Sequence, residues 1–221
     1  MLVEYKDQSG DQQLEVDKLV VAVGRRPFTD GLLADDSGID TDERGFVVVD
    51  DECRTGVKNV FAIGDCVRGP MLAHKGSEEG VLAADLIAGE VAELNYGVIP
   101  SVIYTAPEIA WVGKTEEEVK ASGRAYKTGS FPFAASGRAK AMEQTDGMVK
   151  IISAEDDDEI LGVHIVGPMA GELISEAVLA MEFQASTEDL QRTIHAHPSL
   201  AEAIHEASLA VDNKALNYPN R

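Results

Sequence analysis

A short apolar run, Val60-Phe61-Ala62-Ile63-Gly64-Asp65, ends in glycine and aspartate and is bounded by turn-rich sequence, which predicts a β-strand. Beyond it the apolar residues recur three and four positions apart, which predicts a helix over residues 72–88 that Gly89 ends. The positions that carry this period are Val81, Ala84, Ile87 and Ala88. A strand that ends in Gly-Asp is thus followed closely by a helix amino terminus. Open α/β sheets bind ligands at the carboxyl ends of such strands.

Upstream of this run the sequence predicts further strands. Leu2–Tyr5 and Leu14–Val16 flank a polar turn and predict a β-hairpin. Leu19–Gly24 is almost continuously β-branched, as in a strand buried on both faces of a parallel sheet, and Gly45–Asp50 is a further short strand. A buried parallel strand needs neighbours, and residues 1–18 supply none. We therefore expect this sheet to be completed from later in the chain, or the polypeptide to be a piece of something larger.

From about Tyr96 the pattern changes to α+β. Short turns separate five segments that predict an antiparallel sheet. These segments are 102–104, 110–112, 129–133, 149–152 and 160–166. Helices are predicted over residues 170–183, from a capping box at Ser186, and over residues 198–214 with Pro198 at the first helical position.

The composition argues against several classes of partner. Thirty-nine acidic residues against nineteen Lys and Arg give a formal charge of −20, which repels nucleic-acid phosphates and anionic lipids. The longest apolar runs are far shorter than the ~20 residues that span a bilayer, and no basic-then-apolar leader opens the chain. Cys53 and Cys66 are interpreted as small core residues in a reducing compartment. We expect a soluble cytoplasmic protein.

Two acidic runs are interpreted as surface features. Thr115 and Glu118 form a predicted capping box at the start of a helix. Glu155–Glu159 separates two strand-like segments and is typical of a hairpin turn, and it lacks the spaced ligands and central glycine of a calcium loop. No metal site is predicted.

Asp65 is the first candidate for chemistry. A carboxylate at a strand end can accept hydrogen bonds from the hydroxyls of a polyol or ribose, and the alternative is an aspartate that caps the next segment. The helix that begins near Met71-Leu72-Ala73-His74 favours a ligand, because its amino terminus stabilises negative charge on a bound ring. Arg25-Arg26 is either an anion site or a solvated strand end.

His197 is the second candidate. If Pro198 opens the last helix, His197 lies at the helix mouth and Glu202 lies about a turn and a half inside it, where its carboxylate can orient the imidazole. Such a pair suits general acid–base catalysis near neutral pH, and the alternative is a histidine that only caps the helix. The other histidines of this half, His164, His195 and His205, are interpreted as structural.

Six motifs occur in the order found in the dihydrolipoamide dehydrogenases, and the sequence resembles the carboxyl-terminal half of that family of flavin disulfide oxidoreductases. The motifs are Val23–Pro27, Phe61–Asp65, Met71–Lys75, Pro100–Thr105, Phe131–Phe133 and His197–Glu202. The resemblance implies an α/β remnant of the NAD- and FAD-binding domains followed by an α+β interface domain with an antiparallel sheet and flanking helices. The implied boundaries are 1–27 for the end of the NAD-binding domain, 28–95 for the central domain that contacts FAD, and 96–221 for the interface, or dimerisation, domain.

The resemblance also implies roles for individual residues. Asp65 would bind the ribitol chain of FAD. The residues that would lie against the flavin are Met71, Leu72, Ala73 and His74. His197 would take a proton from dihydrolipoamide, held by Glu202, and would act on the active site of the other subunit of a homodimer. Electrons would pass through a cysteine disulfide and FAD to NAD. The implied protein partner is the acyltransferase core subunit of 2-oxoacid dehydrogenase complexes.

Departures from the family pattern limit what this chain does alone. It has no Gly-x-Gly-x-x-Gly fingerprint and no closely spaced cysteine pair, and Ser199 stands where the family more usually has threonine. We therefore expect the isolated chain to be inactive and to bind neither FAD nor NAD well. Two alternatives remain: a non-catalytic dimerisation and docking module, or a related enzyme such as glutathione reductase or mercuric reductase.

Overall fold

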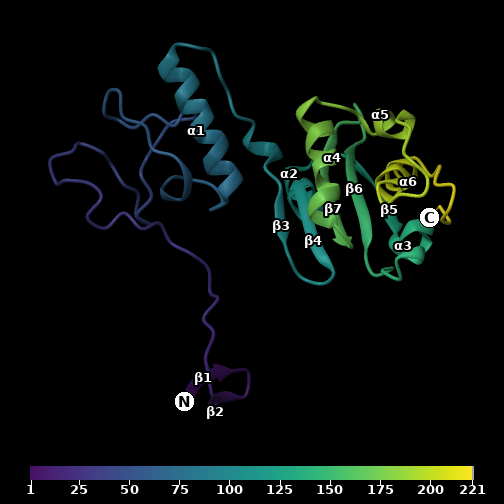
Figure 1. The fold of residues 1–221 in the computed structure, drawn as a ribbon, viewed down its shortest axis with the longest axis horizontal. Coiled ribbons are helices and arrows are strands. Elements are labelled where there is room, and N and C mark those ends of the chain that lie inside the picture. The colour runs from purple at the N-terminus through teal and green to yellow at the C-terminus, as the bar shows by residue number, and fades with distance from the viewer. Residues whose placement is uncertain (221) are drawn as a thin grey trace. The chain divides into compact units, whose positions relative to one another are not determined.

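The structure is a computed structural model that describes residues 1–220. It divides into two compact units, one of residues 1–94 and a second that begins at Asn95. Figure 1 labels the helices and strands of both units.

The second unit is built on a five-stranded antiparallel sheet with strand order β3-β4-β7-β6-β5 (Figure 1). Its strands are β3 (Ser101–Ile103), β4 (Glu108–Gly113), β5 (Tyr126–Pro132), β6 (Met148–Ala154) and β7 (Ile160–Gly167). Its helices are α2 (Glu116–Ser122), α3 (Gly137–Ala141), α4 (Ala170–Glu182), α5 (Thr187–Arg192) and α6 (Glu202–Val211), with short 3₁₀ helices at Tyr96–Val98 and Phe133–Ala135. The predicted antiparallel sheet with flanking helices is confirmed.

Alternation along β6 and β7 gives this sheet two buried faces. Val149 and Ile151 belong to the main core, together with residues of α4 and α6 such as Ile174 and Ile204. The other face carries a smaller cluster in which Val119 of α2 packs on Ile152, Ala154 and Leu161. Sheet residues buried on both sides are held from both sides, so this unit is a rigid platform for the helices that flank it.

Helix α6 is seated very closely on β5. A Cβ atom built on Gly129 of β5 would lie 2.2 Å from the carbonyl oxygen of Ala207 and 2.3 Å from the amide nitrogen of Val211. No larger residue fits between the strand and the helix, so glycine lets the two backbones meet. This contact fixes α6, and with it the position of Glu202 at its first turn.

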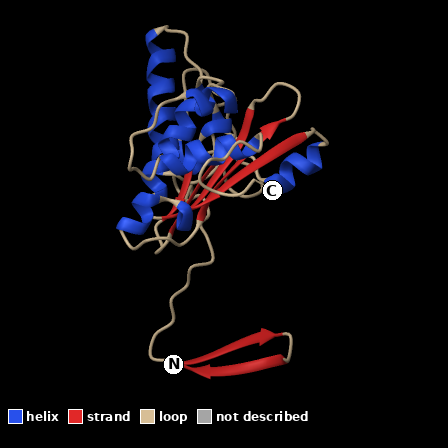
Figure 2. Cartoon of the chain, turned by 90° about the vertical axis from the view of Figure 1, so that its right-hand side faces the viewer, coloured by secondary structure: helices blue, strands red, loops and turns tan. Residues whose placement is uncertain are grey.

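The first unit has little regular structure. It contains a hairpin of β1 (Leu2–Asp7) and β2 (Gly10–Glu15), drawn as two red strands in Figure 2, one long helix, α1 (Ala73–Ala88), and a 3₁₀ turn at Gly64–Cys66. The hairpin and the helix, with Gly89 in the left-handed conformation at its end, are confirmed predictions. Cys53 is buried as expected, whereas Cys66 is half-buried, and neither cysteine forms a disulfide.

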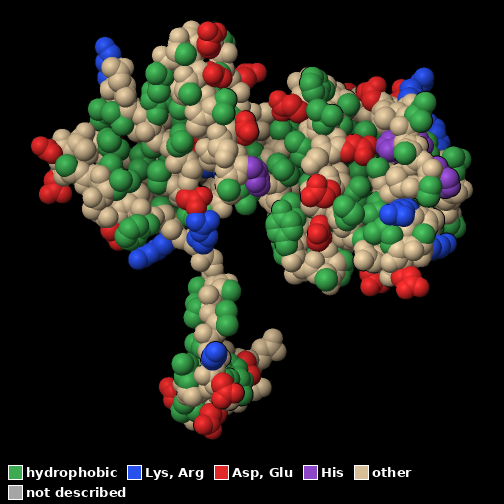
Figure 3. Space-filling model, in the orientation of Figure 1, with side chains coloured by type: hydrophobic (Ala, Val, Ile, Leu, Met, Phe, Trp, Pro, Cys, Tyr) green, Lys and Arg blue, Asp and Glu red, His purple; other side chains and the backbone are tan. Residues whose placement is uncertain are grey.

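Three predicted strands of the first unit are wrong. Leu19–Gly24 is irregular, and Val20 and Val23 are 86% and 93% exposed. Figure 3 shows the hydrophobic side chains, in green, along the extended segment that follows the hairpin. Gly45–Asp50 and Val60–Asp65 form isolated bridges only. A strand is stable only when neighbours accept its backbone hydrogen bonds, and no segment among residues 1–220 pairs with Leu19–Gly24.

The buried residues of α1 are not the ones that carry its apolar period. Val81 and Ile87, which carry the predicted apolar stripe, are exposed. The buried residues are Lys75, Glu79, Leu82 and Ala83, which share one face at helical spacing. The apolar period located the helix, but a charged pair occupies half of the face that is buried in this unit. Among the described helices, none is long and apolar enough to cross a membrane.

Candidate active site

His197 and Glu202 are brought together at the start of α6. The Nδ1 atom of His197 lies 2.8 Å from Oε1 of Glu202, and the other carboxylate oxygen of Glu202 accepts the Ser199 N–H at 2.8 Å. The His197 side chain is 79% exposed, while that of Glu202 is mostly covered. The Glu202 carboxylate therefore holds the His197 ring at Nδ1, while most of the imidazole is exposed to solvent.

The local route to this geometry differs from the prediction. Pro198 follows a cis peptide bond and does not open the helix, which begins at Glu202. The expectation of Pro198 at the first helical position, with Glu202 a turn and a half inside, is wrong. The Glu202 carboxylate accepts a hydrogen bond from the N–H of Ser199, three residues earlier, and so ties the irregular segment that precedes the helix to its first residue. Glu202 consequently lies at the positive end of the helix dipole.

The electrostatics of the pair favour an ionised glutamate. Burial alone would raise the pKa of Glu202, but hydrogen bonds from the Ser199 N–H and from His197 outweigh it and hold the pKa below its usual value. Because a carboxylate only accepts, Nδ1 of His197 donates, and the neutral ring then carries its lone pair on Nε2. This arrangement allows the exposed Nε2 to accept a proton and the glutamate to stabilise the resulting imidazolium.

A second histidine–carboxylate pair lies nearby, as sequence reasoning did not foresee. Nε2 of His195 lies 2.6 Å from Oε1 of Glu176 on α4, and Nδ1 lies 2.9 Å from the Thr193 carbonyl oxygen. The His195 ring is buried and packs on His205, with 4.9 Å between ring centroids. Both ring nitrogens of His195 are used inside the protein, which agrees with the structural interpretation. His164 likewise bonds the Lys114 carbonyl oxygen from within β7.

Asp65 lies in the 3₁₀ turn directly after Gly64, and its carboxylate is half-exposed. The Arg25 guanidinium pairs with this carboxylate and also donates to the Met71 carbonyl oxygen at 3.1 Å. The sequence leaves Arg25 as either part of an anion site or a solvated strand end. In the structure its guanidinium binds an anionic group of the protein itself, the Asp65 carboxylate. The arginine ties the Asp65 turn to the segment that leads into α1.

The amino terminus of α1 lies beside this turn. Leu72 is the cap residue and makes no side-chain capping hydrogen bond, and no acidic residue occurs in the first turn. Ala73 and His74 are exposed, while Met71 and Leu72 are half-buried. The four residues expected to face a flavin thus lie on an accessible helix end whose dipole is not neutralised from within.

Sequence reasoning missed the pair that joins these two elements. Lys75 and Glu79 of α1 form an ion pair, and both bond the backbone of Gly64. The i, i+4 spacing, shared with the buried Leu82 and Ala83, was the available signal. The apolar period drew attention to other residues of α1 instead.

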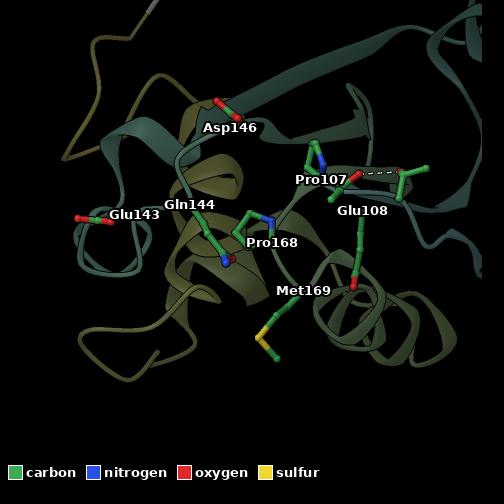
Figure 4. A pocket seen from close by; sticks show the side chains of 9 residues that line it. Pro107, Glu108, Glu143, Gln144, Asp146, Pro168 and Met169 are labelled. Atoms are coloured by element: carbon green, nitrogen blue, oxygen red, sulfur yellow. Dashed lines mark hydrogen bonds between the residues drawn. The ribbon is translucent and has the colours of Figure 1, made fainter.

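A pocket of about 430 Å³ in the second unit holds none of these residues (Figure 4). It is lined by Thr105, Ala106, Pro107, Glu108, Glu143, Gln144, Asp146, Pro168 and Met169. Its lining offers carboxylates and amides but no imidazole or thiol. Within residues 1–220 no three His, Cys, Asp or Glu side chains gather as a metal site. The acidic run at residues 155–159 lies in the β6–β7 turn, and Arg124 pairs with three of its carboxylates.

Profiles of known protein families match both units of the chain. A profile described as pyridine nucleotide-disulphide oxidoreductase matches residues 2–80, and one described as the dimerisation domain of these oxidoreductases matches residues 99–208. The chain belongs to the pyridine nucleotide-disulphide oxidoreductase family. Both the predicted family and the predicted fold class are confirmed.

Individual proteins of known name are similar to this chain over nearly its whole length. The dihydrolipoyl dehydrogenase of Cupriavidus necator is 56% identical over 216 residues, which are 97% of this chain and 46% of that protein. The mitochondrial dihydrolipoyl dehydrogenase of Sus scrofa is 52% identical over 203 residues, which are 91% of this chain and 40% of that protein. This chain therefore spans about half the length of the curated relatives it matches.

Solved structures give the same picture. LpdA from Mycobacterium tuberculosis superposes with a TM-score of 0.84 at 29% identity, covering 91% of this chain and 44% of that one. The HOCl-induced flavoprotein disulfide reductase RclA from Escherichia coli gives 0.82 at 29% identity, covering 89% of this chain and 46% of that one.

The residues present fit part of a flavin site. FAD offers ribitol hydroxyls and an electron-poor ring, and the half-exposed Asp65 carboxylate and the accessible α1 amino terminus suit these groups respectively. Gly64 leaves room for close approach before Asp65, since it carries no side chain. The chain has no glycine fingerprint for the dinucleotide phosphates, so it supplies only one side of such a site.

Proposed function

We propose that this chain is the carboxyl-terminal half of a dihydrolipoyl dehydrogenase, which oxidises protein-bound dihydrolipoamide with FAD as cofactor and NAD as acceptor. The observation that carries the proposal is the His197–Glu202 pair, with 2.8 Å between Nδ1 and Oε1 and an exposed Nε2. The names of the relatives at 52% and 56% identity supply the substrate.

His197 is the acid–base residue in this proposal. Its Nε2 takes the proton of a dihydrolipoamide thiol, and the sulfur keeps the electron pair as a thiolate. Glu202 keeps the proton of Nδ1 in place and stabilises the imidazolium. Cys53 and Cys66 form no disulfide with each other and are not assigned to the disulfide that accepts the electrons.

Asp65 and the start of α1 hold the cofactor. The carboxylate accepts hydrogen bonds from the ribitol hydroxyls, and the Arg25 guanidinium, which pairs with it, holds its orientation. The residues that lie against the ring are Met71, Leu72, Ala73 and His74. When bound, FAD accepts the electron pair of the dithiol and passes it to NAD as hydride.

The assembly is a homodimer, in which His197 of one subunit serves the flavin of the other. The description of the profile matched at residues 99–208 as a dimerisation domain supports this part. The acyltransferase core subunit of a 2-oxoacid dehydrogenase complex is the proposed protein partner. We place the protein in the cytoplasm, where cysteines outside disulfides persist. The pig relative is mitochondrial by name, and cell fractionation tests the location.

A chimera tests the proposed activity, because the isolated chain is expected to be inactive. The chain replaces the matching portion of the Cupriavidus necator enzyme. We expect a yellow protein that forms NADH from dihydrolipoamide. His197→Gln lowers kcat by about 10²- to 10⁴-fold, the usual contribution of a general acid–base residue. Absorption near the flavin bands and NADH formation are the measurements.

His164→Gln is the matched control, since that histidine bonds a backbone carbonyl inside β7, and it leaves kcat within about twofold. A chimera that turns over equally well with Gln at position 197 contradicts the role of His197. A folded but colourless and inactive chimera favours the competing function, a non-catalytic dimerisation module, which the complete core of the second unit supports. The isolated chain making NADH would contradict the expectation that it is inactive.

A further inference from the structure

Lys75 and Glu79 form a fully buried ion pair on α1. Their residues are 2% and 0% exposed, and Nζ lies 3.1 Å from Oε2. The same two side chains bond both backbone polar groups of Gly64. Nζ donates to the Gly64 carbonyl oxygen at 3.0 Å, and Oε2 accepts the Gly64 N–H at 2.7 Å. One ion pair therefore forms hydrogen bonds to both the N–H and the carbonyl oxygen of Gly64, the residue that directly precedes Asp65.

Stability of the helix does not account for this pair. Removing two charges from water costs several kcal/mol per ion, and apolar residues of similar volume are often as stable or more so. Lys75 is the third residue of α1, where a cation opposes the helix dipole. What apolar residues could not supply is the pair of hydrogen bonds to Gly64.

The surrounding glycines show how closely the turn is held to the helix. Gly64 has a φ of +77°, which favours glycine, and a Cβ on Gly76 of α1 would lie 3.1 Å from the Gly64 Cα. A Cβ on Gly69 would lie 2.9 Å from Cε of Lys75. The lysine stem thus packs under the segment that connects the Asp65 turn to α1, while its ammonium group holds the turn itself.

We propose that Lys75 and Glu79 are positioning residues of the flavin site, which fix the Gly64–Asp65 turn against α1 so that the Asp65 carboxylate and the helix amino terminus face the cofactor together. The identity of the cofactor rests on the proposed function, whereas the grip on Gly64 does not. Because Lys75 and Glu79 are buried, they act through the Gly64 backbone and the adjacent Asp65 and not by direct contact with the cofactor.

The first test uses the full 221-residue chain. In Lys75→Met/Glu79→Leu both charges and both hydrogen bonds to Gly64 are lost, while the packed volume is nearly kept. We expect the Gly64 amide to exchange its hydrogen about 10- to 100-fold faster, as follows from losing a hydrogen bond to a charged group. The thermal midpoint stays the same or rises. Amide exchange measured by NMR and thermal unfolding supply the two readouts.

A rescue variant separates hydrogen bonding from packing. Lys75→Met/Glu79→Gln returns an acceptor for the Gly64 N–H without any charge, so slow exchange at Gly64 is expected to return. The exposed pair Glu188–Arg192, which has the same i, i+4 spacing, is the control: Glu188→Gln/Arg192→Gln leaves Gly64 unchanged. If the Leu variant fails to fold, the Gln variant decides: fast exchange at Gly64 in a folded Gln variant overturns the proposal, and slow exchange supports it. Unchanged exchange in a folded Leu variant also overturns it.

The second test measures FAD affinity in the chimera described above. We expect the Lys75→Met/Glu79→Leu variant to bind FAD about 10- to 100-fold more weakly, the loss found in metal sites when residues that orient the metal ligands are removed. The Gln variant recovers part of the affinity. Unchanged FAD affinity in a variant whose Gly64 amide exchanges fast means that the pair is only structural. A parent chimera that binds no FAD contradicts the proposed function instead, and the exchange measurement on the chain still decides whether the pair positions the turn.

Discussion

The two units of this chain hold their candidate chemical groups by different means. In the second unit His197 and Glu202 stand at the start of α6, which is seated on β5 of a sheet buried on both faces. In the first unit Asp65 lies in a turn with few regular elements around it, and a buried ion pair and an arginine hold it. A packed core positions one group, and specific polar contacts position the other.

The difference shows that strand propensity is not enough to make a strand. Leu19–Gly24 and Val149–Ile152 have similar β-branched sequences. The second segment pairs with β5 and β7 and is buried, whereas the first has no partner and is exposed. Backbone hydrogen bonds to neighbours, and not side-chain type, decide between the two outcomes.

The largest expected difference between the two units is in their rates of amide hydrogen exchange. We expect the amides of β6 and β7 to exchange at least about 10³-fold more slowly than unprotected amides, since they open only with the core. Amides of residues 19–24 should exchange at nearly the unprotected rate. Exchange followed by mass spectrometry measures both in one sample, and strong protection at residues 19–24 would remove the contrast.

Core truncation sharpens the comparison at the level of single side chains. Ile151→Ala leaves a cavity in the main core and should lower the free energy of unfolding of the second unit by about 2 to 5 kcal/mol. Val21→Ala removes an exposed side chain of the first unit and should change the free energy of unfolding of the protein by less than about 0.5 kcal/mol. Denaturant unfolding measures both variants. Equal losses would show that residues 19–24 are packed in solution.

The smallest expected effect concerns an ion pair that joins elements of the second unit. Hydrogen bonds from Lys127 and Gln191 lower the pKa of Asp212 from 3.8 to about 2. The folded state therefore favours the carboxylate, so its contribution is complete above about pH 4 and is lost as the pH falls toward 2. Allowing for solvent screening, Asp212→Asn should lower the free energy of unfolding by about 1 to 2 kcal/mol at pH 7.

The effect of the same substitution should become small by pH 2, because the Asp212 carboxyl is protonated as the pH falls through its folded-state pKa of about 2. Urea unfolding of both proteins at several pH values measures the difference. The exposed pair of Glu52 and Arg54 in the first unit is the control, and Glu52→Gln should change stability by less than about 0.5 kcal/mol at either pH. A loss that is as large at pH 2 as at pH 7 would mean that packing and not charge accounts for the effect of Asp212.

The candidate residues were largely predictable, while their surroundings were not. The His197–Glu202 pair follows from a motif six residues long, because its two members are only five positions apart in the chain. Arg25 and Asp65 are forty positions apart, and Glu176 and His195 are nineteen apart, so no local pattern connects them. Even within α1, apolar periodicity located the helix but not its buried residues, since a buried Lys–Glu pair contributes nothing to such a pattern.

The sequence by itself determined the family, the antiparallel sheet of the second unit, both capping boxes, the hairpin and the extent of α1, because these depend on residues close together in the chain. Tertiary structure alone decided that Leu19–Gly24 forms no strand, that α6 begins at Glu202, and that Lys75 and Glu79 grip Gly64. These outcomes depend on which distant groups are available to complete a hydrogen bond or cover a side chain. Local propensity does not contain that information.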